Sequence, residues 1–318
     1  MSAAVVRNGR VTVVLPTYNR ADFLPRAIET ALSQTAVDRC DVVVVDDGST
    51  DETASVIARY GERVVGVQQT NGGLPVARNT AVCTRRNEYA AFLDDDDLWE
   101  PDKIERQLAA FERFPQAVLV AGRTIDRFPD GGQRMHRIPP IELDRPIDLA
   151  PHLFETNFLP PSSVMVRTQT LFDVGLFHPR MRRAQDSHMW VRLACRGPGV
   201  LLGSPVATYF VAMPGALSNN TFSQLSYKLR GRYMLRRELR RRPDCRQNWH
   251  RGLAIAFTNL RDVAYRQGRF DVAARYGLRS LLHRPWGRPR WEWARLFESL
   301  YRTTLGSSPA SSNGHGRR

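Results

Sequence analysis

The first 121 residues alternate between short apolar segments typical of β-strands and segments with the spacing of amphipathic helices. Runs of β-branched residues predict buried strands, and apolar residues three and four positions apart predict the helices between them. Strict alternation of this kind predicts a parallel, doubly wound α/β sheet with helices on both faces. The expected strands cover 11–15, 42–45, 64–67, 89–93 and 117–121, and the expected helices cover 22–35, a segment that ends near 60, 74–84 and 102–114.

The alternation weakens after residue 121. Residues 122–161 are rich in proline and lack periodicity, which predicts a long surface excursion. Further strands are expected at 162–166 and 200–211, the second broken by Pro205, with a helix at 186–196 between them. From Tyr227 onward the spacing is helical, and two antiparallel helices are expected at 249–267 and 270–283. We therefore expect an α/β domain over 1–226, a basic α-helical extension over 227–305 and a disordered tail over 306–318.

Positive charge is concentrated in the last third of the chain. Residues 228–318 contain 22 basic and six acidic side chains, whereas the preceding residues contain 24 and 26. Arginines cluster with apolar residues at 229–242 and with tryptophans at 284–293. This pattern fits either helices on an anionic membrane surface or an arginine-rich bundle packed on the α/β domain. Because no nucleic-acid recognition motif accompanies the charge, we do not expect a nucleic-acid partner.

The chain shows no signal for export or membrane insertion. No run of 18 apolar residues occurs, and the apolar stretch 11–16 is too short for a signal peptide. Cys40, Cys83, Cys195 and Cys245 have no metal-binding spacing, so we expect reduced, buried thiols. These features predict a cytoplasmic protein, and the basic helices add peripheral contact with the inner face of the cytoplasmic membrane as an alternative.

Four consecutive aspartates, Asp94 to Asp97, directly follow the expected strand at 89–93. Adjacent carboxylates repel each other, and a divalent cation such as Mg²⁺ or Mn²⁺ would stabilise them. Mg²⁺ usually takes one or two protein carboxylates together with phosphate oxygens of a substrate. The alternative is a solvated acidic cap before Leu98.

Polar residues also follow other expected strands, and ligands of such sheets bind at the carboxyl ends of the strands. The segment that starts at Pro16 offers the ring of Tyr18 for stacking on a base. Asp47 and its neighbour Asp46 are candidates to accept hydrogen bonds from a nucleobase or ribose. Arg78, after a glycine pair, is a candidate to contact a phosphate or to pair with a carboxylate.

Taken together and in order, these motifs resemble those of the family 2 glycosyltransferases. The motifs are Val-Leu-Pro-Thr-Tyr-Asn-Arg at 14–20, Val-Asp-Asp-Gly-Ser-Thr-Asp at 45–51, Asn-Gly-Gly with Ala-Arg-Asn-Thr at 71–80, and Phe-Leu-Asp-Asp-Asp-Asp at 92–97. The resemblance covers roughly residues 10–215. It implies a GT-A fold, which has a mixed sheet, a nucleotide-sugar donor, and an inverting transfer that depends on Mg²⁺ or Mn²⁺.

The resemblance also implies roles by position. Tyr18, held by the loop that starts at Pro16, would stack on the base, and Asp47 would accept a hydrogen bond from it. A carboxylate that accepts an imide N–H suits a UDP- or dTDP-sugar better than a guanine nucleotide. Asp94 would contact the ribose, and Asp95 would share that role. Asp96 would bind the metal. Arg78 would lie near the phosphates or pair with the carboxylates.

The family places its catalytic base on a later Glu-Asp pair at the start of a helix. Asp186 matches the aspartate and would remove the acceptor hydroxyl proton, although Gln185 replaces the glutamate. The alternative for Asp186 is an ordinary acidic residue favoured by the helix dipole. A second departure follows Tyr209, where Phe210 and Val211 replace the family's arginine and histidine.

The sequence therefore predicts an inverting glycosyltransferase of cell-surface polysaccharide or glycoconjugate biosynthesis. Its acceptor would be a glycan or a lipid-linked sugar. The alternative from a different class is a catalytically inactive GT-A domain that binds sugar nucleotides or serves as a scaffold. A nucleotidyltransferase is disfavoured because the segment at 16–22 is not a glycine-rich phosphate loop.

Overall fold

The computed structural model describes residues 7–211, 221–283 and 290–304. The chain divides into two compact units, residues 1–249 and 250–318, and each is described by itself. The disordered tail expected at 306–318 lies outside the described residues.

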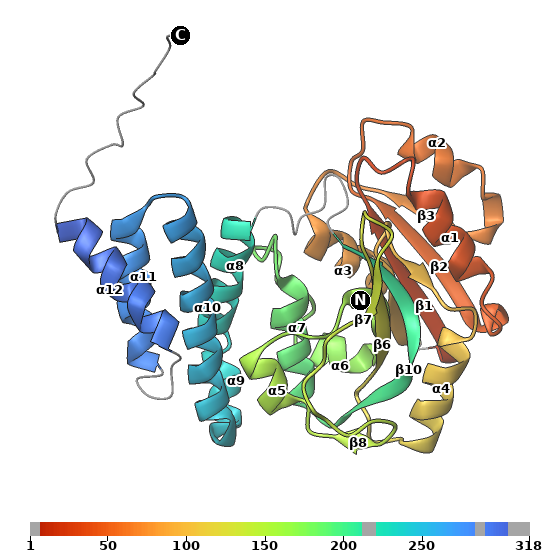
Figure 1. The fold of residues 1–318 in the computed structure, drawn as a ribbon. Helices are drawn as coiled ribbons and strands as arrows, with labels where there is room; N and C mark the ends of the chain where they lie inside the picture. The colour runs from red at the N-terminus through yellow and green to blue at the C-terminus, as the bar shows by residue number, and fades with distance from the viewer. Residues whose placement is uncertain (1–6, 212–220, 284–289, 305–318) are drawn as a thin grey trace, which may run out of the picture. The chain divides into compact units, whose positions relative to one another are not determined.

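The first unit is built on one ten-stranded sheet with the strand order β3-β2-β1-β4-β9-β6-β10-β5, in which β7 pairs with β6 and β8 with β10 (Figure 1). The strands are β1 (Arg7–Thr17), β2 (Cys40–Asp46), β3 (Val65–Gln68), β4 (Asn87–Phe92), β5 (Leu98–Trp99), β6 (Leu119–Arg127), β7 (Gln133–Met135), β8 (Pro146–Ile147), β9 (Val164–Arg167) and β10 (Gly199–Phe210).

The sheet is mixed, as the GT-A fold requires. Strands β3, β2, β1 and β4 are parallel, which confirms the alternation in the first hundred residues. Strand β9 runs antiparallel to both β4 and β6, which makes the sheet mixed. Val164 at the start of β9 pairs with Ala121, and Val166 pairs with Leu119, so β9 runs toward the start of β6.

Helices cover both faces of the sheet, and Figure 1 shows α1 and α4 on one side and α6 and α7 on the other. On the first face, alternate residues of β1 and β2 pack against apolar residues of α1 and α4. On the opposite face, Phe92 packs against Phe177 and Trp190. The helices of this part are α1 (Leu24–Leu32), α2 (Thr53–Ala58), α3 (Leu74–Thr84), α4 (Lys103–Arg113), α5 (Ala150–Glu155), α6 (Thr168–Asp173) and α7 (Gln185–Ala194).

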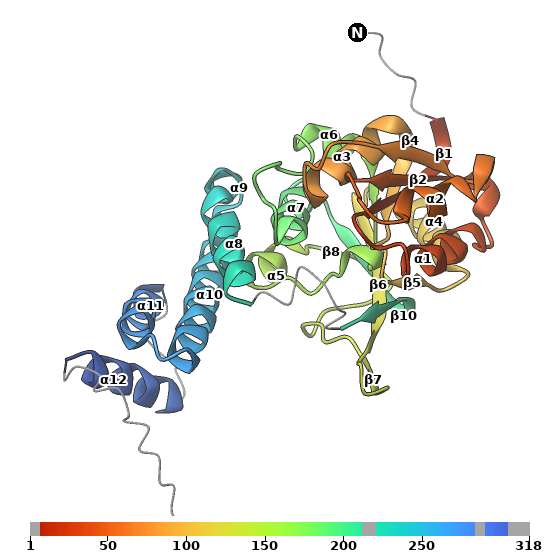
Figure 2. The same cartoon turned by 90° about the horizontal axis from the view of Figure 1, so that it is seen from above.

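The proline-rich segment 122–161 is more ordered than its sequence predicts. Strand β6 continues to Arg127, and the β6–β7 hairpin extends beyond the main sheet (Figure 2). Strand β8 and helix α5 also lie in this segment. Near the end of the unit, β10 passes through Pro205 as one strand with an irregular register, so the proline interrupts the pairing rather than the strand.

Two basic helices, α8 (Thr221–Met234) and α9 (Arg236–Arg241), belong to the first unit. Arg232 is 8% exposed, and its guanidinium donates hydrogen bonds to the carbonyls of Phe154 and Glu155 in α5. Arg242 donates to Asp148 just before α5. These contacts favour the packed-bundle interpretation for the arginine cluster at 229–242.

The second unit consists of α11 (Phe270–His283), α12 (Arg290–Thr304) and α10 (Arg246–Arg266) from His250 onward. The two helices expected at 249–267 and 270–283 are confirmed, and Gly268 between them has a φ of 70°, a conformation that glycine adopts without strain. Thr258 and Ser280 are hydrogen-bonded at 2.8 Å and join α10 to α11.

The cysteines and the helices test two smaller expectations. All four cysteines are free, but only Cys245 is buried and Cys83 is exposed, so the expectation of four buried thiols is wrong. Among the described residues, no helix combines the length and the apolar character that crossing a membrane requires.

Candidate functional site

The loop after β1 presents Tyr18 to solvent. Tyr18 is 47% exposed, although it directly follows a buried strand. Asn19 has a φ of 52°, its N–H donates to Ser49 Oγ at 2.9 Å, and its Oδ1 accepts from the N–H of Thr50 at 2.8 Å. These bonds fix the loop against the segment after β2. An exposed ring on a fixed loop is suited to stacking on a flat ligand.

Asp47, just after β2, orders the turn before α3. Its carboxylate accepts hydrogen bonds from the backbone N–H groups of Gly72 and Gly73 at 2.9 and 2.8 Å and from Gln69 Nε2 at 2.7 Å. The side chain is 4% exposed. Gly73 has a φ of 85°, so the turn depends on glycine there. Asp47 thus holds the glycine pair against the end of β2.

Asp46, the neighbour of Asp47, has the less satisfied carboxylate. Its Oδ1 accepts from the N–H of Ser49 at 2.8 Å, whereas its Oδ2 is buried without a hydrogen-bond partner in the described residues. A buried carboxylate oxygen without a donor is costly, and a ligand N–H would relieve that cost. The motif marks both aspartates, but only the structure distinguishes their environments.

Arg78 and Asp94 form an ion pair at the carboxyl end of β4. Nη2 of Arg78 lies 2.5 Å from Oδ1 of Asp94, with exposed side-chain fractions of 1% and 24%. The guanidinium also lies over the ring of Phe177, 5.5 Å from its centroid. The ion pair joins α3 to the aspartate run. The sequence allows Arg78 either a phosphate contact or a pair with a carboxylate, and the structure shows the pair.

The negative charges of Asp95 and Asp96 are only partly compensated by their neighbours. Thr17 Oγ1 donates to Asp95 Oδ2 at 2.7 Å, and Arg20 Nη2 lies 3.4 Å from Asp96 Oδ2. Burial and the charge of Asp96 raise the pKa of Asp95 to about 7. Burial and the charge of Asp94 raise the pKa of Asp96 to about 6. Repulsion within the run exceeds the compensation from Arg20, so a cation would stabilise both carboxylates.

The fourth aspartate, Asp97, has a structural environment. It is fully buried, and its carboxylate accepts from Ser162 Oγ at 2.5 Å and from the N–H of Phe210 at 3.2 Å. Burial raises the pKa of Asp97 well above its usual value. Asp97 therefore ties the aspartate run to the segment before β9 and to the end of β10.

The aspartate run suits a metal ion that takes only some of its ligands from the protein. Within the described residues, no group of three or more His, Cys, Asp and Glu side chains is arranged as a complete metal cage. The half-buried Asp94, Asp95 and Asp96 instead offer adjacent oxygen ligands, and the pKa values of the last two are elevated. This donor set fits Mg²⁺ or Mn²⁺ held by one or two carboxylates, with the other ligands supplied by a substrate diphosphate and water.

Asp186 lies in the first turn of α7. Its Oδ2 accepts a hydrogen bond from Asn157 Nδ2 at 2.8 Å, and the side chain is half-buried. Ala184, just before the helix, has a φ of 51°. Asn157 comes from the proline-rich segment, whose sequence carries no motif that would have identified it. The Asn157 contact orients the carboxylate, as a base requires.

Aromatic packing places α7 beside the end of β4. Trp190, one turn after Asp186, lies 5.3 Å from Phe92 between ring centroids, and Phe92 is two residues before Asp94. The indole of Trp190 donates to the carbonyl of Leu159 at 3.0 Å. The structure thus joins the segments of Tyr18, Asp47, Arg78 and the aspartate run by direct contacts, and joins Asp186 to them through Trp190.

The chain belongs to glycosyltransferase family 2. The family model, glycosyl transferase family 2, matches residues 12–174, which is half of the chain and includes all four motifs around the strand ends. The mixed sheet and flanking helices described above are the GT-A fold of this family.

Curated relatives are glycosyltransferases and polysaccharide synthases by name. An uncharacterized glycosyltransferase of Rickettsia felis is 27% identical over 189 residues, which is 58% of this chain and 31% of that protein. The chondroitin synthase of Escherichia coli is 37% identical over 131 residues, which is 40% of this chain and 19% of the synthase. The chain therefore spans less than a third of the length of either relative.

Solved structures share the fold. Residues 1–349 of Staphylococcus aureus TarS, in complex with UDP-GlcNAc, match with a TM-score of 0.68 and 17% identity over 93% of this chain and 92% of that one. The mannosyltransferase PcManGT of Pyrobaculum calidifontis, in complex with GDP-Man and Mn²⁺, matches with a TM-score of 0.58 and 19% identity over 93% and 87% of the two chains.

Proposed function

We propose that this protein transfers a sugar from a UDP- or dTDP-sugar to an acceptor hydroxyl with inversion at the anomeric carbon. The observation that carries the proposal is the contact set at the strand ends. Arg78 on Asp94, Thr17 on Asp95 and Arg20 on Asp96 arrange a crowded carboxylate run beside the exposed ring of Tyr18. Such an arrangement suits a ligand with a base at one end and a metal-bound diphosphate at the other.

On the donor side, Tyr18 and the loop from Pro16 would stack on the base, and a carboxylate after β2 would accept the imide N–H. Asp47 is the residue that the family motif suggests. The unpartnered Oδ2 of Asp46 makes Asp46 a second candidate for that hydrogen bond, with Asp47 shaping the glycine turn. Uracil and thymine each present a single imide N–H, flanked by two carbonyl groups, that a carboxylate oxygen can accept.

On the acceptor side, Asp186 would remove the proton of the attacking hydroxyl. Asn157 fixes the orientation of its carboxylate, so the base is directed before the acceptor arrives. Attack on the face opposite the leaving diphosphate inverts the anomeric carbon in one displacement. The hydroxyl oxygen forms the new bond, the bond to the diphosphate breaks, and the proton passes to Asp186.

A divalent metal belongs to this proposal. Asp96 would hold Mg²⁺ or Mn²⁺, with Asp94 and Asp95 next to it directed to the ribose. When bound, the metal would stabilise the negative charge that develops on the leaving diphosphate. The PcManGT structure is a complex with GDP-Man and Mn²⁺, and the TarS structure is a complex with UDP-GlcNAc. Both support a nucleotide-sugar donor here, and the first supports its use with a metal.

We also propose an acceptor in cell-surface polysaccharide or glycoconjugate assembly, either a glycan or a lipid-linked sugar. Support comes from the chondroitin synthase relative, a polysaccharide-forming enzyme by its name. A lipid-linked acceptor would bring the protein to the inner face of the cytoplasmic membrane. In the second unit, Leu282 and Tyr301 are 80% and 66% exposed among arginines, which supports peripheral contact there.

Calorimetric titration of the purified protein with UDP, dTDP and GDP, each with and without Mn²⁺, tests the donor assignment. We expect Mn²⁺-dependent binding of UDP or dTDP that is tighter than binding of GDP. Preference for GDP would contradict the assignment of a UDP- or dTDP-sugar donor. Absence of binding by folded protein would favour the inactive scaffold, the alternative that shares this fold.

A further inference from the structure

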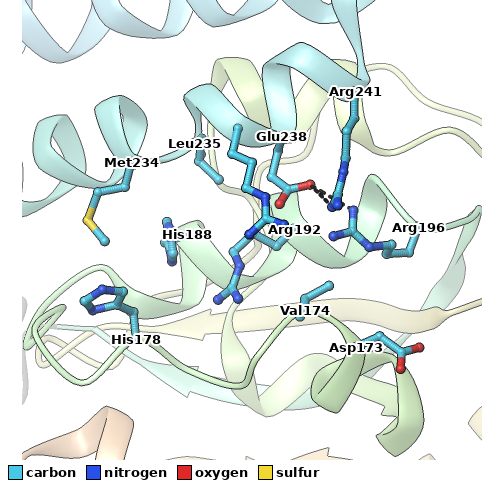
Figure 3. Close-up of a pocket in the computed structure, with 11 residues that line it drawn as sticks. Asp173, Val174, His178, His188, Arg192, Arg196, Met234, Leu235, Glu238 and Arg241 are labelled. Atoms are coloured by element: carbon cyan, nitrogen blue, oxygen red, sulfur yellow. Dashed lines mark hydrogen bonds and ion pairs between the residues drawn. The ribbon is translucent and has the colours of Figure 1, made fainter.

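A cavity of about 210 Å³ lies in the first unit, lined by residues of α7 and α9 (Figure 3). His188 and Arg192 line it one helical turn apart on α7, Arg196 lines it just after the end of that helix, and α9 closes it from the other side. Residues two apart on an α-helix point about 200° apart, so His188 and Asp186 face different surroundings. We call this cavity the arginine pocket, defined by His188, Arg192, Arg196, Arg237, Glu238 and Arg241.

The arginine pocket has an excess of positive charge. Four arginines line it, against the two carboxylates of Asp173 and Glu238. Glu238 contacts Arg196 at 2.8 Å and Arg241 at 3.5 Å, and Asp173 accepts a hydrogen bond from Gln169. Both acids are therefore already engaged, and the positive charge is not balanced within the pocket.

Arg192 contributes to this excess of positive charge. Its Nη1 donates to the carbonyl of Leu176 at 2.8 Å, a neutral partner that brings no opposite charge. Burial, followed by the charges of Arg196 and Arg237, lowers the pKa of Arg192 against the opposing effect of Glu238. A half-buried cation beside other cations is stabilised by an anion.

His188 provides a second, independent indication of a ligand. The side chain is 6% exposed, and its Nδ1 is buried without a hydrogen-bond partner in the described residues. Buried polar atoms in folded proteins nearly always have a partner. The side chain of His188 lines a pocket that already carries excess positive charge.

We propose that the arginine pocket binds a phosphate group. Guanidinium groups match the oxygens of phosphate in pairs of hydrogen bonds, and an imidazole N–H adds a further donor. The volume is below the ~300–1,000 Å³ of sites that enclose a drug-sized ligand, so the pocket suits a small anionic group rather than a nucleotide sugar. The phosphate is either free or part of a lipid headgroup, and both present the same oxygens.

Two double variants of α9 test the proposal at equal net charge. Arg237→Gln with Arg241→Gln removes two exposed arginines of the pocket. Arg236→Gln with Arg240→Gln removes two arginines of the same helix that do not line it. None of the four side chains is buried, so neither pair should prevent folding, which circular dichroism would verify.

The first readout is calorimetric titration of the full chain with inorganic phosphate in the presence of a chelator, which keeps divalent metal out of the donor site. We expect the pocket pair to weaken phosphate binding by about tenfold or more, because two charged hydrogen-bond donors are lost. The control pair should stay within about twofold. Equal weakening in both pairs, or no phosphate binding by the unmodified protein, would overturn the proposal.

The second readout separates the sources of the phosphate. Sedimentation with phosphatidylglycerol vesicles, against phosphatidylcholine vesicles, is measured for both pairs. Competition by inorganic phosphate together with a selective loss in the pocket pair assigns the site to a lipid headgroup. Equal sedimentation of both pairs, combined with the calorimetric difference, assigns it to soluble phosphate. Neither readout needs a sugar donor, so failure here leaves the transfer proposal intact.

Discussion

Nη2 of Arg78 lies 2.5 Å from Oδ1 of Asp94, and this contact joins α3 to the end of β4. The same guanidinium is 1% exposed, and its Nε and Nη1 atoms have no hydrogen-bond partner in the described residues. Arg78 therefore has donors that remain available at the point where the donor diphosphate is proposed to bind. The pair combines a structural contact with unused hydrogen-bonding capacity.

Arg78→Met should weaken Mn²⁺-dependent binding of UDP by about tenfold or more, because a charged donor to the phosphates is lost. The free energy of unfolding should fall by only about 1–2 kcal/mol, since two unpaired buried donors disappear with the ion pair. Calorimetry and urea unfolding measure the two effects. The same Arg78→Met change is then made in the Asp94→Asn variant. If UDP affinity falls further, Arg78 contacts the phosphates; if it does not, Arg78 acts only through its ion pair with Asp94.

Asp96→Asn should abolish Mn²⁺-dependent transfer and leave the fold intact. The pKa of Asp96 is raised to about 6 by burial and Asp94, so the carboxylate destabilises the folded state as pH rises from about 4 through 6. The amide removes this charge, and the free energy of unfolding at pH 7.5 should rise by roughly 1–2 kcal/mol. Asp38→Asn, at an exposed position, is the matched control. Full activity of the Asp96 variant would refute the metal assignment.

Asp186→Asn should lower kcat by at least about 100-fold, as expected for removal of a general base, with UDP affinity within about twofold of the original. Asn157→Ala should lower kcat by about tenfold, because the carboxylate loses the hydrogen bond that orients it. Steady-state kinetics and UDP calorimetry measure both variants. A collapse of UDP affinity in the Asp186 variant would show that the residue supports the donor site instead.

The donor-side strands are predictable from the sequence because their signals are local. Strands β1, β2 and β4 are apolar runs that end in polar motifs, and each motif stands next to its strand. The antiparallel insertion of β9 between β4 and β6 is not predictable in this way, because strand pairing depends on residues far apart in sequence. The contact between Asn157 and Asp186 is unpredictable for the same reason, because the two residues lie far apart in the sequence.

Charge patterns predict less about this structure than apolar patterns do. Arg232 belongs by sequence to a cluster of basic residues, yet the structure buries it against two carbonyls of α5. Its charge alone gives no sign of this, because long side chains reach partners on other elements. Similarly, Asp46 and Asp47 are adjacent in the motif, and only the fold reveals that Asp47 holds the glycine turn.

The buried imidazole of His188 predicts an acid-sensitive fold. Its pKa is lowered to about 3 by burial, then by Arg192 and His178, from 6.5 in an unfolded chain. The folded protein keeps the ring neutral, while the unfolded chain takes up a proton below pH 6.5. Stability that is present above pH 6.5 is therefore lost progressively as pH falls toward 3.

His188→Phe should remove this loss. At pH 7.5 the free energy of unfolding should change by less than about 1 kcal/mol, because the ring is neutral in both states and an unpaired nitrogen is removed. At pH 5 the unmodified protein should lose about 2 kcal/mol through this residue, and the variant should not. Urea unfolding of both proteins at the two pH values measures the difference. Equal losses in the two proteins would mean that His188 titrates in the folded state much as it does in the unfolded chain, and that its burial does not keep the ring neutral.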